Sequence, residues 1–289
     1  MDTISRLYDY GRNAVRAERD ARRLKDRYKI PDKVLIYESY VDTTSKLSMR
    51  GLSRVYKRPP PESRKGFGGK QLIIHRHKKA ISKLWEMTRD GKLKNAFKDS
   101  DLSDLAIVTV HNYNGKSMFE QSLDFLGVED YTVLKHSGEW MMCYKYIYLL
   151  EFLEECEKPY ILFCDARDTI FTDDPAKAVP LFKEFECEAL FNATMSPRGI
   201  FKSYEWAESL YWWSRIIAGT TWRKRYSNAG AFIGKTEFIR EICEVISFYC
   251  DRIGCKKYPH SDQDVLRAIY PWFWPRMTCD YYNKMFYRN

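Results

Sequence analysis

Residues 160–171, YILFCDARDTIF, constrain the fold of this chain more than any other stretch of it. Residues 160–164 are an apolar run that is short enough for a buried strand. The run ends in Asp165, and Asp168 follows three residues later. Acidic side chains at the carboxyl end of a buried strand lie where open α/β sheets bind their ligands. The stretch therefore predicts an α/β sheet with a ligand site at the end of this strand.

Asp165 and Asp168 are candidate metal ligands. Two carboxylates that are held close together repel each other, and a divalent cation relieves the repulsion. Oxygen ligands suit Mg²⁺ or Mn²⁺, whose remaining positions substrate phosphate oxygens can fill. A strand-end turn explains the same residues: Asp165 would cap the next segment and Asp168 would pair with Arg167. The spacing alone leaves both interpretations open.

The segments around this stretch predict a β-α-β-α-β order. Residues 106–110 and 131–134 are apolar and read as strands, and helices are expected up to residue 126 and over residues 140–156. This order predicts parallel strands with right-handed crossovers, as in half of a Rossmann-like fold. No GxGxxG follows the first strand, which argues against a dinucleotide cofactor. Further helices are expected at residues 175–185, 236–252 and 260–270, and a strand at residues 189–193.

Positive charge is concentrated in the first third of the chain. Residues 1–100 contain 26 Lys and Arg against 12 Asp and Glu, a net charge of +14, whereas the rest carries −5. We expect residues 1–100 to form a basic, mainly helical N-terminal extension and residues 101–289 to form a second domain, which the family resemblance given below implies is catalytic. In an expected helix over residues 71–98, His75 and His77 point to different faces, which favours a solvated basic face over a metal pair. The charge favours a polyanionic partner such as DNA.

Nothing in the sequence reads as a targeting segment. The first twenty residues are charged, no run of about 18 apolar residues occurs, and the eight cysteines contain no CxxC pair. We therefore expect a cytoplasmic protein with reduced cysteines and no membrane span. A viral or phage origin would fit an enzyme that modifies DNA. The oligomeric state stays open.

Four motifs, taken in order, resemble one family. The chain from about residue 105 to residue 286 is similar to the nucleotide-sugar glycosyltransferases of the GT-A fold, above all to the glycosyltransferase domain of procollagen lysyl hydroxylases and to procollagen galactosyltransferases. The motifs are FCDARDTIF (163–171), YSNAGAFIG (226–234), SDQD (261–264) and CDYYNKMF (279–286). The resemblance implies a GT-A fold, which is a Rossmann-like, mostly parallel sheet flanked by helices. It does not extend to residues 1–100.

The resemblance also implies a metal-bound donor. Asp165 and Asp168 would hold Mn²⁺, or Mg²⁺, on the diphosphate of a UDP-sugar, so that the metal stabilises the leaving group. Asp280 is the third candidate ligand. The family places a histidine after this aspartate, where the present chain has Tyr281, so Asp280, Tyr281 or water could complete the metal shell.

Other site residues follow from the same resemblance. Asn228 and Gly230 would lie against the donor sugar, and Asp262 and Gln263 would lie over the donor sugar and the acceptor. The expected catalytic residues are Asp262, Gln263 and Asn228. The expected residues for the nucleotide sugar are Thr109, His111, Tyr113, Lys145, Asp165 and Gly230. Simpler readings stay open: a tight turn at residues 228–230, a helix N-terminal acid at position 262, and a surface lysine at position 145.

The leading hypothesis is a metal-dependent glycosyltransferase that moves a sugar from a UDP-sugar to a hydroxyl group. A hydroxymethylated base in DNA is one acceptor that the basic N-terminal region favours, and a cytosolic glycan or protein hydroxyl is the alternative. A metal-dependent nuclease or other phosphoryl transferase, and an inactive sugar-nucleotide-binding module, are the competing classes. The sequence does not name the sugar or say whether the anomeric configuration is retained.

Overall fold

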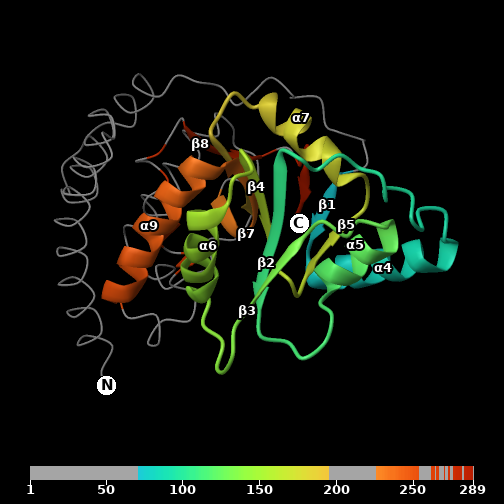
Figure 1. Ribbon diagram of the computed structural model, residues 1–289, viewed down its shortest axis with the longest axis horizontal. Helices are drawn as coiled ribbons and strands as arrows, with labels where there is room; N and C mark the ends of the chain where they lie inside the picture. The colour runs from blue at the N-terminus through green and yellow to red at the C-terminus, as the bar shows by residue number, and fades with distance from the viewer. Residues whose placement is uncertain are drawn as a thin grey trace.

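The computed structural model describes residues 71–194 and 226–253, and it also describes residues 262, 263, 265, 266, 270, 273, 276–281 and 283–288. Residues 1–70 of the expected N-terminal extension lie outside the described residues. Within them, helices pack against two sheets (Figure 1). None of the described helices is both long and apolar enough for a membrane crossing.

A six-stranded mixed sheet forms the centre of the structure. Its order is β3-β2-β4-β7-β6-β8. The strands are β2 (Leu105–His111), β3 (Thr132–Lys135), β4 (Tyr160–Cys164), β6 (Ala189–Thr194), β7 (Tyr226–Lys235) and β8 (Met277–Asp280). β2 is parallel to both β3 and β4, and β6 is parallel to β8, whereas β7 is antiparallel to β4 and β6. The predicted α/β class and the parallel β3-β2-β4 unit are confirmed.

Helices cover both faces of this sheet. The helices are α4 (His77–Asp90), α5 (Met118–Leu126), α6 (Tyr144–Glu155), the 3₁₀ turn η2 (Pro175–Lys177), α7 (Ala178–Lys183) and α9 (Thr236–Ile253). α6 and α9 lie together on one side, and α4 and α5 lie on the other (Figure 1). Side chains of β4 alternate between two hydrophobic clusters, with Phe163 on the α6 side and Leu162 on the α5 side. β4 is therefore buried on both faces, as its apolar sequence predicts.

A second, three-stranded sheet has the order β5-β1-β9. Its strands are β1 (Ile73–His75), β5 (Thr169–Phe171) and β9 (Phe286–Tyr287). The helix that we expected over residues 71–98 is wrong at both ends, because β1 precedes α4 and α4 ends at Asp90. Ile73 and Ile74 pair with β5 and β9, and this long-range pairing overrides the helical rhythm of the sequence.

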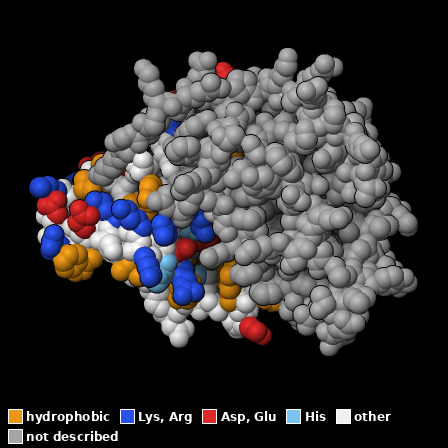
Figure 2. Space-filling model, turned by 180° about the vertical axis from the view of Figure 1, so that it is seen from behind, with side chains coloured by type: hydrophobic (Ala, Val, Ile, Leu, Met, Phe, Trp, Pro, Cys, Tyr) orange, Lys and Arg blue, Asp and Glu red, His pale blue; other side chains and the backbone are white. Residues whose placement is uncertain are grey.

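The residues from 71 to 100, which we assigned to the N-terminal extension, pack into the α/β body. Leu72, Ala80 and Met87 belong to the same buried cluster as residues of β2, β4 and α5. Exposed cations remain on the outside, and Figure 2 shows Lys and Arg side chains gathered beside His and acidic side chains. The basic character of this part of the chain is therefore a property of its outer face.

Candidate metal centre

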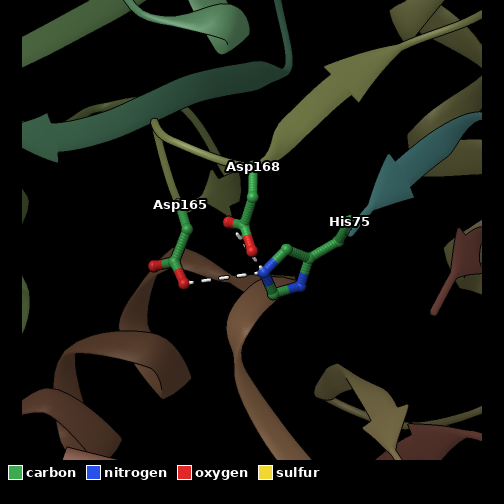
Figure 3. Close-up of side chains that lie close together, drawn as sticks. All are labelled: His75, Asp165 and Asp168. Carbon is green, nitrogen blue, oxygen red and sulfur yellow. Dashed lines mark ion pairs between the residues drawn. The ribbon is translucent and has the colours of Figure 1, made fainter. Parts of the chain in front are cut away.

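His75, Asp165 and Asp168 converge at one end of the central strand β4 (Figure 3). The His75 Nε2 atom lies 3.2 Å from Asp168 Oδ1 and 3.6 Å from Asp165 Oδ2. One donor atom from each residue falls within 4.8 Å of the other two. One imidazole nitrogen and two carboxylate oxygens form a donor set that a divalent transition metal accepts. The expected pair of aspartates is thus joined by a histidine that we assigned to a solvated face.

Backbone pairing fixes the three residues. His75 ends β1, Asp165 directly follows β4, and Asp168 directly precedes β5. The Asp165 amide donates to the carbonyl of Gly230 at 2.7 Å, and the Arg76 amide donates to the carbonyl of Asp168 at 2.9 Å. The centre therefore lies where the two sheets meet.

Gly230 on β7 makes room for this cluster. A Cβ atom at this position would lie 1.8 Å from His75 Cε1 and 2.6 Å from Asp165 Oδ2, far inside van der Waals contact. The resemblance assigned Gly230 to the donor sugar, whereas its neighbours in the structure are two of the candidate metal ligands. The absence of a side chain here is a steric requirement of the centre.

The two carboxylates remain accessible although His75 is buried. The His75 side chain is 1% exposed, whereas those of Asp165 and Asp168 are 35% and 26% exposed. Burial acts to raise the pKa of Asp168, but His75, Arg288 and His77 outweigh it and lower this pKa to about 2. Asp168 is therefore ionised at neutral pH, and its partner is His75 rather than the Arg167 of the strand-end alternative.

Lys145 connects Asp165 to Asp262. Its Nζ atom lies 2.7 Å from Asp262 Oδ2 and 3.6 Å from Asp165 Oδ1, and it donates to the carbonyl of Ala229 at 3.2 Å. Burial acts to lower the pKa of Lys145, but Asp165 and Asp262 raise it overall, so the lysine stays charged. Lys145 and Asp262 are both buried, so the surface-lysine alternative is wrong.

Gln263 and Asn228 form hydrogen bonds to each other and to the backbone of β7. Gln263 Oε1 accepts from the Asn228 amide and from the Ala229 backbone, both at 3.0 Å, and Gln263 Nε2 donates to the carbonyl of Ser227. Asn228 Oδ1 accepts from the Gly230 amide and from Arg288. β7 is continuous through residues 228–230, so the tight-turn alternative is wrong. The polar atoms of both side chains hold β7 and its neighbours in place.

The expected nucleoside residues divide into two kinds. Thr109 is buried and donates to the Cys164 carbonyl at 2.7 Å, and buried His111 lies 3.0 Å from a Glu120 oxygen. Tyr113 is 40% exposed and stacks on His111 with ring centroids 4.8 Å apart. Burial raises the pKa of Tyr113, and the charges of Asp165 and Asp168 raise it further while Arg167 lowers it. Of the three, Tyr113 has an open ring near the aspartates.

Asp280 and Tyr281 lie outside the three-residue cluster. Asp280 is fully buried, and its carboxylate accepts from the backbone amides of Lys284, Met285 and Phe286 at 2.7–2.9 Å. The hydroxyl of Tyr281 lies 2.7 Å from that of Tyr270. These contacts give Asp280 a role in holding the loop between β8 and β9.

Sequence reasoning missed three residues around the centre: His75, Asn192 and Arg288. Asn192 Nδ2 lies 3.1 Å from His75 Nδ1, and Arg288 Nη1 lies 2.9 Å from both ring nitrogens of His75. One signal for His75 was present, because it ends the apolar run 72–74 as Asp165 ends its own. Asn192 and Arg288 have no such local signal and reach the site only through strand pairing.

The donor set fits a divalent cation: two accessible carboxylates and one imidazole nitrogen lie together, and a glycine leaves the space they need. Around them lie the cations Lys145 and Arg288 and the further carboxylate of Asp262. Comparison with known proteins adds no family assignment to this geometry. The chain matches no protein-family model and no curated protein.

Proposed function

We propose that this chain is a metal-dependent glycosyltransferase of the GT-A type that moves a sugar from a UDP-sugar to a hydroxyl acceptor. The observation that carries the proposal is the pair Asp165 and Asp168 at the carboxyl end of β4, with His75 and charged Lys145 beside it. This is the position at which open α/β sheets bind ligands. The four ordered motifs and the mixed, mostly parallel sheet support it.

The charges around the centre suit an anionic donor that arrives with a cation. The carboxylates of Asp165, Asp168 and Asp262 face the cations Lys145 and Arg288, which leaves one formal negative charge in excess. A bound Mn²⁺ or Mg²⁺ supplies electrostatic stabilisation to the departing diphosphate. Lys145 holds Asp165 in place and adds a fixed positive charge, and Arg288 is placed to pair with a phosphate oxygen.

Two residues are candidates for the remainder of the donor. The open ring of Tyr113 can stack on a uracil base. Asn228 lies two residues before Gly230 on β7, and Gln263 and Arg288 hold its side chain. In the transfer, the bond between the sugar and the diphosphate breaks and UDP leaves. The acceptor oxygen forms the new bond to the sugar carbon, and the hydroxyl proton is released to water or to the departing UDP.

The acceptor that the charge favours is hydroxymethylated DNA. Residues 1–100 carry +14, and Arg76, Lys78 and Lys79 are exposed directly after His75. Contacts between such residues and phosphates make binding depend on salt. Binding to duplex DNA should therefore weaken as salt is added, with log Kd rising linearly with the logarithm of the salt concentration. A flat dependence would leave a glycan or protein hydroxyl as the acceptor.

Substitution of the aspartates tests the activity. Asp165→Asn and Asp168→Asn should each lower turnover of a UDP-sugar with Mn²⁺ by at least about 100-fold, because one charged ligand is lost. Mass spectrometry of UDP release and of glycosylated DNA measures the effect. Asp99→Asn is the matched control, since Asp99 is exposed and distant from the centre in sequence.

Retained turnover in both aspartate variants would contradict the assigned role. Cleavage of DNA by the wild-type chain with Mn²⁺ and no UDP-sugar would replace the proposal with the nuclease class. Binding of UDP-sugars without hydrolysis or transfer to any acceptor would indicate a binding module.

A further inference from the structure

We propose that His75 is the third protein ligand of a divalent cation held by Asp165 and Asp168, and that Asn192 holds the His75 ring for this role. This proposal rests on the metal dependence of the proposed function and names the residues that would bind the metal. It places a ligand from the N-terminal strand β1 in a centre that the sequence located on β4 and β5.

The separations of His75 from the two carboxylates approach those between neighbouring ligands of an octahedral ion. Metal–ligand bonds of 2.0–2.2 Å place neighbouring ligand atoms of an octahedral ion about 3 Å apart. His75 Nε2 lies 3.2 Å and 3.6 Å from the nearest oxygens of Asp168 and Asp165. Small side-chain rotations therefore bring all three atoms to one ion. The more exposed side of the carboxylates stays open for water or phosphate oxygens.

The ring of His75 has little freedom to leave this position. Its side chain is 1% exposed, and its Cε1 atom lies against the backbone of Gly230. β1 pairs on both sides, with β5 and with β9, which fixes the backbone that carries the ring. A ligand preorganised in this way loses little conformational entropy when a metal binds.

Asn192 can support both states of the ring. In the structure Asn192 Nδ2 lies 3.1 Å from His75 Nδ1, close enough to donate to this nitrogen when it carries no proton. A metal at Nε2 would leave the ring proton on Nδ1, which would then need an acceptor. Asn192 Oδ1 is buried and has no hydrogen-bond partner among the described residues. Rotation of the amide presents this oxygen to Nδ1, as outer-shell acceptors of metal-bound histidines do.

Arg288 competes with the metal for His75. Its Nη1 atom lies 2.9 Å from Nε2, so a cation bound there displaces it from the ring. Asn228 Oδ1, 3.2 Å from the same atom, remains as its partner.

The nitrogen ligand selects among metals. Carboxylates alone suit Mg²⁺ and Mn²⁺ alike, whereas imidazole favours transition metals over Mg²⁺. The wild-type chain should therefore bind Mn²⁺ more tightly than Mg²⁺. Replacement of His75 by a side chain without nitrogen ligation should reduce this preference.

Pulsed electron paramagnetic resonance of the full chain with Mn²⁺, alone and with UDP, tests the proposal directly. Bound Mn²⁺ should show coupling to an imidazole ¹⁴N nucleus that changes when histidine is labelled with ¹⁵N. The coupling should vanish in His75→Ala and persist in His77→Ala, whose histidine is exposed two residues away. Asn192→Leu should keep the coupling and weaken Mn²⁺ binding about 10- to 100-fold. Asn192→Asp supplies a hydrogen-bond acceptor and should restore the affinity for Mn²⁺.

The wild-type spectrum decides the outcome even if His75→Ala fails to fold. Bound Mn²⁺ without nitrogen coupling, or no bound Mn²⁺ in either sample, would overturn the assignment of His75. Mn²⁺-dependent turnover of a UDP-sugar without the coupling would overturn this inference and keep the proposed function. The coupling without turnover of any UDP-sugar would support His75 as a ligand and count against glycosyl transfer.

Discussion

Gly230 is the residue on which the geometry of the candidate centre depends most directly. It contributes no ligand atom, yet its missing side chain is the space in which His75 and Asp165 approach each other. The carbonyl of the same residue accepts the amide of Asp165. Position 230 therefore controls both the room for the ligands and the backbone that carries one of them.

Gly230→Ala should abolish Mn²⁺ binding and lower the free energy of unfolding by about 1–3 kcal/mol, because the new Cβ overlaps the buried His75 ring and the Asp165 carboxylate. Urea denaturation and titration with Mn²⁺ measure the two effects. Gly115→Ala is the matched control, since a Cβ at Gly115 meets no atom within 4 Å. Unchanged Mn²⁺ affinity in Gly230→Ala would show that the metal binds elsewhere.

At the scale of elements, helix α5 is tied to strand β2 through one carboxylate. Ser117 and Glu120 form a capping box at the start of α5, with the Ser117 amide donating to Glu120 at 2.7 Å. The same Glu120 carboxylate lies 3.0 Å from His111 Nε2 at the end of β2. Burial acts to raise the pKa of Glu120, but the contacts from Ser117 and His111 lower it overall below its ordinary value of 4.5.

This pKa gives α5 a pH-dependent contribution to stability. Because the folded pKa is lower than the unfolded value, ionised Glu120 stabilises the fold above about pH 4.5. The contribution is lost as the pH falls through the folded pKa. Glu120→Gln should lower the free energy of unfolding by about 1.5–3 kcal/mol at pH 7, and the difference from wild type should shrink below pH 4.5.

Urea denaturation across this pH range measures the effect, with Glu151→Gln as the control because Glu151 is exposed on α6. A difference between wild type and Glu120→Gln that stays constant down to acid pH would refute the role of the ionised carboxylate.

At the scale of the whole molecule, the centre joins distant parts of the chain. His75 comes from β1, the aspartates come from the middle of the sequence, and Arg288 follows β9 near the C-terminus (Figure 1). β1, β5 and β9 also share one sheet. A cation at this junction would link the second sheet to the end of β4, so its binding should stabilise the fold as a unit.

Mn²⁺ should therefore raise the free energy of unfolding of the wild-type chain by about 2.7 kcal/mol at a free concentration 100 times its Kd. Urea denaturation with Mn²⁺ and with a chelator measures the difference. The Asp165→Asn, Asp168→Asn double variant should show no such shift. An equal shift in the double variant would mean that Mn²⁺ binds outside the centre.

Much of the architecture is determined locally. The apolar runs of β2, β4 and β6 and the periodic helices α5 and α9 have the lengths and patterns of their elements, so the sequence located them. Asp165 and Asp168 were located as well, because a charged residue that ends a buried strand is visible without any partner. Element ends were less accurate: α6 begins at Tyr144, after the expected start at residue 140.

Tertiary structure decided which residues complete the centre. The register of β1 against β5 places His75 opposite Thr169 and next to Asp168, although His75 is far from both in sequence. The pairing of β7 with β4 brings Gly230 beside Asp165. No local pattern encodes these neighbours, since they depend on pairing between segments separated by many residues. The sequence by itself determined the α/β layers and the acidic end of β4, because hydrophobic periodicity is a local property. The approach of His75 and Asn192 to the two aspartates is decided only when the chain folds, because strand pairing brings them together.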